Sequence, residues 1–111
     1  MKIQGTNISM IRGDSESLTV RCTQDGNPAP LENGDTIYFT VREDAESEIA
    51  LQKAVTEFTE EGEAVIGIGH GDTEGMETGD YVYDVQLTRA DGTVTTLVPI
   101  SRFRLTEEVT Y

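Results

Sequence analysis

The sequence predicts an all-β fold: a single sandwich of antiparallel sheets, with about seven strands, over residues 1–111. Two observations predict it. Short runs rich in Ile, Val, Thr, Tyr and Phe recur along the chain, and Gly-Asp or Asp-Gly pairs, which favour tight turns, separate them. A chain of 111 residues also suits one domain, because it can bury a core without a metal or a disulfide.

Most of the expected strands show the two-residue alternation of a sheet with one buried face. In the run from 36 to 42, for example, Ile37, Phe39 and Val41 share one face. The segment 89–93 is typical of a tight hairpin between the last two strands. In chain order the expected strands are Asn7–Arg12, Ser17–Thr23, Thr36–Arg42, Glu63–His70, Tyr81–Arg89 and Thr93–Leu105.

Two segments depart from this alternation. The pattern over 44–60 is mixed and fits either a short helix or a pair of irregular strands. We expect strands at Ile49–Lys53 and Val55–Thr59, because a sandwich needs a connection there that continues a sheet. Pro99 interrupts the last run and has no N–H, so we expect that strand to lie at an edge and to contain a bulge.

The charge is large and concentrated in the middle of the chain. The net charge is −13, and residues 43–80 hold twelve acidic groups against Lys53 alone. An acidic chain disfavours nucleic acid and anionic membranes, which bind Lys and Arg, so the expected partner is a protein. We expect the acidic segment to form one face that selects a basic partner.

Targeting signals also bear on the expected location. No stretch approaches the length of a membrane span, and the first residues turn polar at once, so a signal peptide is not expected. A single cysteine, Cys22, permits no internal disulfide. These features predict synthesis and folding in the cytoplasm.

Catalysis finds little support in the sequence. His70 is the sole histidine, and Cys22 lies on the apolar face of an alternating run, where a thiol is inert. We therefore expect no enzyme activity, no cofactor, and a surface position for His70 at a strand end. The one candidate metal site is an acidic loop that offers oxygen ligands to calcium, although its spacing matches no EF-hand. That candidate consists of Asp72, Glu74, Glu77 and Asp80.

A local motif resembles the tyrosine corner of immunoglobulin-like domains. In Glu77-Thr78-Gly79-Asp80-Tyr81-Val82-Tyr83, the corner residue is Tyr81, whose hydroxyl is expected to bond back to the backbone near the preceding loop. The resemblance places Cys22 at the first cysteine position of such domains and Tyr83 at the second. It implies an immunoglobulin-like sandwich without its disulfide, in which Cys22, Tyr81 and Tyr83 are structural residues.

A second resemblance covers nearly the whole chain. The order of Asn33-Gly34-Asp35-Thr36, Gly79-Asp80-Tyr81 and Asp91-Gly92-Thr93 before their strands is similar to immunoglobulin-like modules of tailed phages and prophages, such as the N-terminal domain of the phage upper baseplate protein. The resemblance implies a non-enzymatic assembly module of a virion tail or baseplate that binds other tail subunits or itself.

The sequence also suggests how such a module binds. We expect it to use an unpaired edge strand, either Asn7–Arg12 or the strand that contains Pro99, together with the acidic face. The alternative function is an adhesion module that binds carbohydrate, or binds in a calcium-dependent way, through loops at one end of the sandwich.

Overall fold

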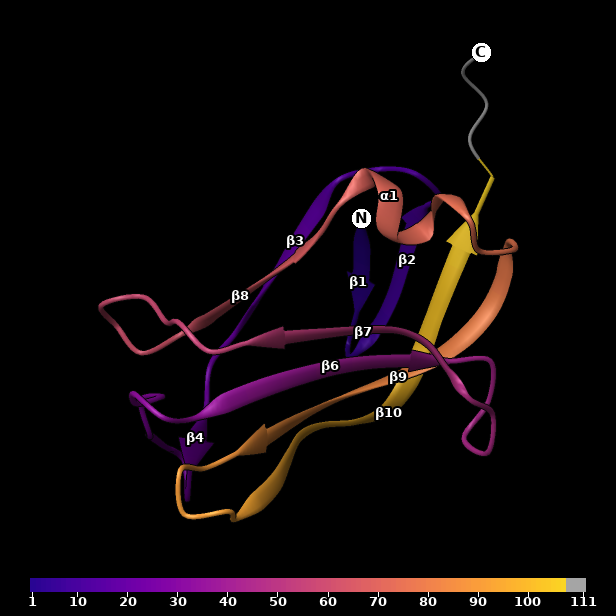
Figure 1. Cartoon of the computed structure of the whole chain (residues 1–111). Coiled ribbons are helices and arrows are strands. Elements are labelled where there is room, and N and C mark those ends of the chain that lie inside the picture. The colour runs from indigo at the N-terminus through magenta and orange to yellow at the C-terminus, as the bar shows by residue number, and fades with distance from the viewer. Residues whose placement is uncertain (108–111) are drawn as a thin grey trace.

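The computed structural model describes residues 1–107 and has two layers of strands (Figure 1). A six-stranded sheet has the order β1-β2-β10-β9-β6-β7, and a two-stranded sheet pairs β3 with β8. A small hairpin pairs β4 with β5 beside them. The strands are β1 (Lys2–Gln4), β2 (Asn7–Ile11), β3 (Glu16–Val20), β4 (Thr23–Gln24), β5 (Asn27–Pro28), β6 (Thr36–Arg42), β7 (Ile49–Val55), β8 (Ala64–Ile68), β9 (Gly79–Thr88) and β10 (Val94–Thr106). The predicted all-β sandwich is confirmed.

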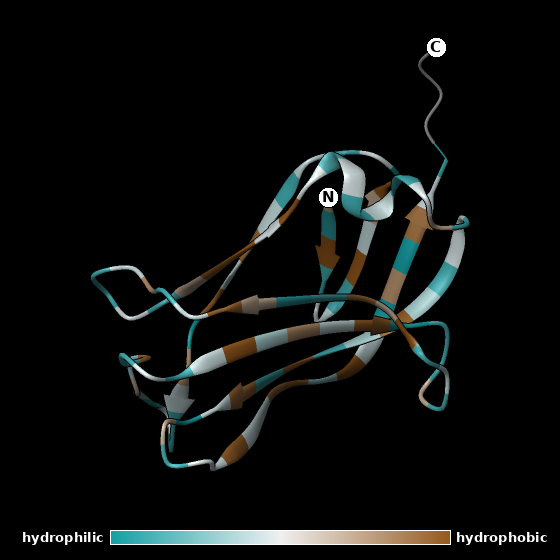
Figure 2. Cartoon of the chain, in the orientation of Figure 1, coloured by the Kyte–Doolittle hydropathy of each residue, from teal (hydrophilic) through white to brown (hydrophobic). Residues whose placement is uncertain are grey.

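Alternation along the strands sets which side chains enter the core. In β9 every second residue from Tyr81 to Leu87 is buried, while the residues between them are half-buried on the outer face. β6 repeats the pattern and pairs with β9 in antiparallel register, Phe39 opposite Val85. Figure 2 shows the resulting bands of apolar and polar residues along the strands of the large sheet. Burying one face of the alternating strands holds the two layers together.

Aromatic side chains fill the middle of this core. The ring centroids of Phe39 and Tyr83 are 5.3 Å apart, and Phe103 packs edge-on against both. The Tyr83 hydroxyl donates to the carbonyl of Thr6. At the start of β9 the Tyr81 hydroxyl donates to the carbonyl of Glu77 at 2.6 Å, which is the hydrogen bond that the corner motif predicts.

The predicted edge strands are wrong. β2 lies between β1 and β10, and β10 lies between β2 and β9, so the edges of the large sheet are β1 and β7. β10 also runs parallel to β2, a pairing that places residues 8–11 beside residues 103–106. The expected bulge at Pro99 is present between Val98 and Ser101. The irregularity takes Pro99 out of the ladder, so its missing N–H leaves no gap in an interior strand.

The connection from 43 to 78 also differs from expectation. Only one strand, β7, occupies the region where two were predicted, and residues 56–59 are irregular. After β8 the chain forms one short helix, α1 (His70–Glu74), where a strand end was expected. Asp72 causes this turn, because its carboxylate accepts the N–H of Gly69 at 2.6 Å and closes the first turn. Across residues 1–107, no helix has the length and apolar character that a membrane span requires.

Candidate functional site

The two long sides of the sandwich are built differently. On one side β7 approaches β8 and joins the two layers. Leu51 and Val55 of β7 pack against the core there. Lys53 Nζ also reaches Asp72 Oδ2 in α1 at 2.7 Å, and both side chains are largely shielded from solvent. We call this side, formed by β7, β8 and α1, the closed side.

The opposite side lies at the other edges of the two sheets, and over residues 1–107 strand pairing joins the layers on neither side. β1 is the edge of the large sheet, and β3 is the edge of the small one. Ile3 lies opposite the buried Ile8 in the ladder, so its side chain faces the interior of the sandwich, yet it is 48% exposed. Met1 is 39% exposed, and Leu18 of β3 is only partly buried. We call this side, formed by β1 and β3 with Met1, the open side.

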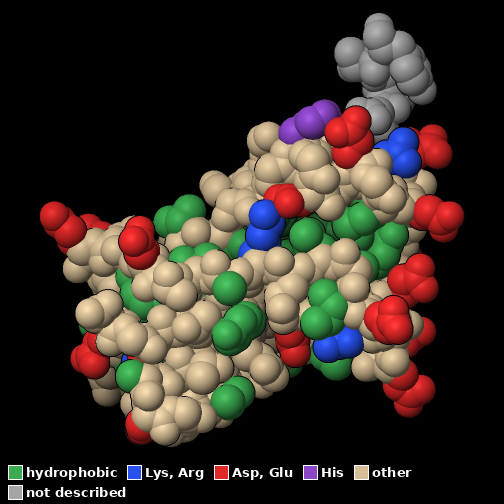
Figure 3. Space-filling view, viewed as in Figure 1, with side chains coloured by type: hydrophobic (Ala, Val, Ile, Leu, Met, Phe, Trp, Pro, Cys, Tyr) green, Lys and Arg blue, Asp and Glu red, His purple; other side chains and the backbone are tan. Residues whose placement is uncertain are grey.

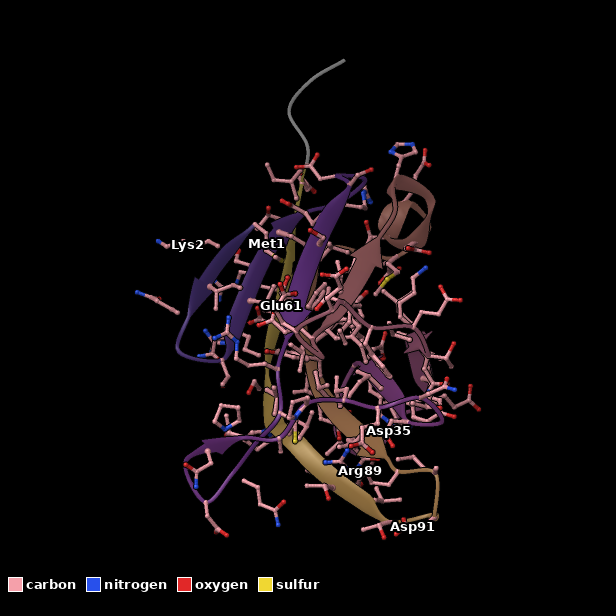
Figure 4. All side chains as sticks on the ribbon, turned by 90° about the vertical axis from the view of Figure 1, so that its left-hand side faces the viewer. Met1, Lys2, Asp35, Glu61, Arg89 and Asp91 are labelled. Atoms are coloured by element: carbon pink, nitrogen blue, oxygen red, sulfur yellow. The ribbon has the colours of Figure 1, made fainter. Side chains whose placement is uncertain are left out.

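On the open side a polar contact connects the N-terminal residue to β3. The amino group of Met1 forms an ion pair with Glu16 at the start of β3. Figures 1 and 4 show β1 and β3 in the two layers on the same side of the molecule. An exposed apolar residue on the inner face of an edge strand is uncommon in a β-sandwich, because edge strands are usually charged or covered.

A hollow of about 530 Å³ lies at one end of the sandwich between β4 and the hairpin that joins β9 to β10. Arg89 Nη1 donates to Asp35 Oδ2 at 2.8 Å, and the Asp35 side chain is only 4% exposed. Figure 4 shows these two side chains directed toward one another, with Asp91 at the hairpin. Asp35 also accepts the N–H groups of Glu32 and Ala90.

The pKa of Asp35 reflects this environment. Burial raises the pKa, but the donors at Glu32, Arg89 and Ala90 outweigh burial and lower it below the ordinary value. Asp35 therefore stays ionised and ties the loop before β6 to the hairpin. Because its oxygens are already satisfied by these donors, the pair is a structural clamp and not a vacant binding group.

The predicted calcium ligands are not gathered around one point. Asp72 is paired with Lys53, and Asp80 Oδ1 accepts Arg104 Nε at 2.8 Å. Glu74 Oε2 lies 3.0 Å from His70 Nε2 within α1. Over residues 1–107, no group of three or more His, Cys, Asp or Glu side chains is arranged to hold a metal ion. The predicted clustering came from closeness in sequence, whereas Asp72, Glu74 and Asp80 pair with three different partners.

The acidic middle segment does not form one face. Glu43, Asp44, Glu46 and Glu48 lie in or beside the β6–β7 loop, whereas Glu57, Glu60, Glu61 and Glu63 lie in the β7–β8 loop. These loops leave β7 at its two ends, so the strand separates them. Figure 3 shows acidic side chains at opposite extremes of the molecule. The expected single acidic face is therefore wrong.

The cysteine position also needs correction. Cys22 is buried, but it lies in the stretch between β3 and β4, outside any strand. It lines the hollow together with Leu87. Leu87 is four residues along β9 from Tyr83, or about 13 Å, so the two positions of an immunoglobulin disulfide are not placed opposite one another here. His70, which was expected at the surface, is exposed on α1, and its ring contacts the carbonyl of Gly13.

The geometry defines an all-β sandwich with one closed and one open side. Among solved structures, the chain is similar to CopC from Methylosinus trichosporium OB3b, with a TM-score of 0.53 and 11% sequence identity. The match covers 95% of this chain and 89% of that chain. No family model and no curated protein sequence matches the chain. At this identity the likeness shows the fold alone.

This comparison overturns the resemblance to phage modules. The matched structure is CopC and not a tail or baseplate component, so the predicted phage assembly function is wrong, and the adhesion alternative gains no support. The error has a physical source. The Gly-Asp and Asn-Gly motifs that carried the resemblance are turn chemistry, which any sandwich with short hairpins requires in a similar order.

Sequence reasoning missed the open side. The three residues of β1 are too few for a periodic signal, and they were not predicted as a strand. One signal was available: Ile3 and Ile8 flank Gly5-Thr6, which is the spacing of a hairpin with a glycine in its turn. Gly5 indeed has a φ of 61° in that turn.

Proposed function

We propose that this chain is a non-catalytic protein-binding module that accepts an extended segment of another protein along β1. The observation that supports it is Ile3, which faces the interior of the sandwich from an edge strand and remains 48% exposed. A segment that pairs with β1 would extend the large sheet and cover this side chain. Strand addition of this kind combines main-chain hydrogen bonds with side-chain contacts.

The thin second layer supports the same conclusion. Two strands, β3 and β8, cover a sheet of six, and β3 is paired on one side only. On this side Met1 and Ile3 are exposed apolar residues, and Leu18 of β3 is only partly buried. Covering them removes apolar surface from water, which stabilises the complex by about 25 cal/mol per Å² of apolar area before the cost of association.

The net charge favours a different protein over a second copy. Each copy carries −13, so two copies repel one another as they approach. Self-pairing through β1 would also bring the ion pairs of Met1 and Glu16 from both copies to one interface. We therefore expect the accepted segment to come from another chain.

A peptide titration tests the proposal. The probe is a synthetic octapeptide of alternating valine and threonine, titrated into ¹⁵N-labelled protein and followed by amide chemical shifts. We expect the largest shifts at Lys2, Ile3 and Gln4, and loss of binding in Ile3→Glu. The matched control is Ile49→Glu, which places the same change at a 45%-exposed isoleucine on the opposite edge strand, β7. Binding that Ile49→Glu removes and Ile3→Glu leaves intact, or no shift in β1, would overturn the proposal.

A further inference from the structure

A group of cations occupies the outer face of the sheet next to β1. Lys2 of β1 and Arg102 and Arg104 of β10 are exposed, and together they are three of the eight Lys and Arg residues in the chain. Figure 4 shows Lys2 projecting outward from β1. The strand between them, β2, carries short polar side chains on this face, Asn7 and Ser9.

The register explains how these residues come together. Lys2 lies opposite Ser9, and Ser9 lies opposite Arg104, so the three form one row across β1, β2 and β10. Asn7 and Arg102 belong to the adjacent row, where Asn7 Oδ1 accepts the backbone N–H of Arg102 at 2.9 Å. Strand spacing puts the Lys2 and Arg104 backbones about 10 Å apart.

Long side chains on both sides of short ones leave a hollow above β2. It has a volume of about 200 Å³ and is lined by Lys2, Gln4, Asn7, Ile8, Ser9, Arg102 and Arg104. The walls are therefore cationic, and much of the floor is polar. Amide and hydroxyl groups in the floor can donate to an oxyanion that the walls attract.

The neighbouring carboxylate does not neutralise the hollow. Asp80 engages Arg104 only through Nε, and both side chains are about half exposed, so this pair is weak and can share its guanidinium. The three cations and Asp80 sum to +2 locally.

We propose that the hollow above β2 is a binding site for a ligand that carries two or more oxyanion groups, contacted by Lys2, Arg102 and Arg104. The shared chemistry is a polyanion, whether a free polycarboxylate or phosphate or a glutamate-rich segment of a protein. Arginine suits this role because its planar fork pairs with two oxygens of one group. The site lies on the outer face, so it is separate from the interior-facing Ile3.

Three probes distinguish the sources: citrate, inorganic pyrophosphate and a hexaglutamate peptide, each titrated into ¹⁵N-labelled protein at low salt. We expect saturable amide shifts in β1, β2 and the 102–104 stretch of β10, weakening steeply with added sodium chloride. Tighter binding of citrate or pyrophosphate indicates a small-molecule ligand, and tighter binding of hexaglutamate indicates a protein segment.

Substitution sharpens the test. Arg102→Gln should weaken the best probe about tenfold, because a hydrogen bond to a charged group contributes about 1.5 kcal/mol or more. The matched control is Arg21→Gln, another exposed arginine, which is paired with Glu63 away from this hollow. Ile3→Glu serves as a second control and should still respond at β10, which separates this site from the proposed strand binding. Equal affinity in Arg102→Gln and Arg21→Gln, or no saturable shift with any probe, would refute the site.

Discussion

The closed and open sides of the sandwich differ in how their edge strands are covered. On each side the large sheet ends in an edge strand, β7 on the closed side and β1 on the open side. On the closed side, β7 turns its half-buried residues toward β8, and Lys53 bridges to Asp72 across the gap. On the open side, Ile3 has no strand over it, although it faces inward like Ile8. The residues of the closed side therefore stabilise the fold, whereas the exposed residues of the open side contribute little to it.

The largest expected effect comes from a glycine in the loop that leads into the closed side. Gly62 has a φ of 76°, and a Cβ placed there would lie 2.5 Å from the Cβ of Pro30. We expect Gly62→Ala to lower the free energy of unfolding by about 3 kcal/mol, since it combines a strained backbone with overpacking. Urea denaturation measures it.

Gly67→Ala is the matched control for Gly62→Ala, because Gly67 lies in β8 itself and an added Cβ there meets no atom within 4 Å. We expect it to leave the free energy of unfolding within about 0.5 kcal/mol of the wild type. Similar losses in the two variants would show that the loop at Gly62 is no more sensitive to an added Cβ than β8 itself.

The next effect concerns Asp72 and depends on pH. The hydrogen bond from Lys53 and then the N–H of Gly69 lower the pKa of Asp72 below its ordinary value. A lowered folded-state pKa adds stability above the unfolded pKa of about 3.9, and this stability disappears as the pH falls through the folded-state value. We expect Asp72→Asn to lose about 1 kcal/mol at pH 7 and to approach the wild type near pH 2, in denaturation curves at both pH values. A constant difference across this range would contradict the ionic role.

The smallest expected effect lies on the open side. Ile3→Ser removes a side chain that is already 48% exposed, so we expect a loss of about 0.5 kcal/mol or less in the free energy of unfolding. Ile8→Ala, its buried neighbour in the ladder, should cost about 3 kcal/mol. Comparable losses from the two substitutions would mean that Ile3 is covered in solution and that the open side does not exist.

Much of the fold could be predicted because its signals are local. Alternation in the runs that became β6 and β9 reports which residues face the core, and it requires no knowledge of the partner strand. Neither candidate site could be predicted in this way. Lys2 is 100 residues from Arg102 in sequence, and only the pairing of β2 with both β1 and β10 brings them to one hollow. The acidic loop residues, close in sequence, are conversely directed to different partners.

The sequence by itself determined the all-β fold class, because side-chain alternation and turn residues act within a few positions of one another. The tertiary structure decided which strands became edges, where the bulge at Pro99 could be tolerated, and which side of the sandwich stayed open. These outcomes depend on pairings between distant strands, above all the parallel pairing of β2 with β10. Long-range pairing is set by the sum of many contacts, so no single motif in the sequence records it.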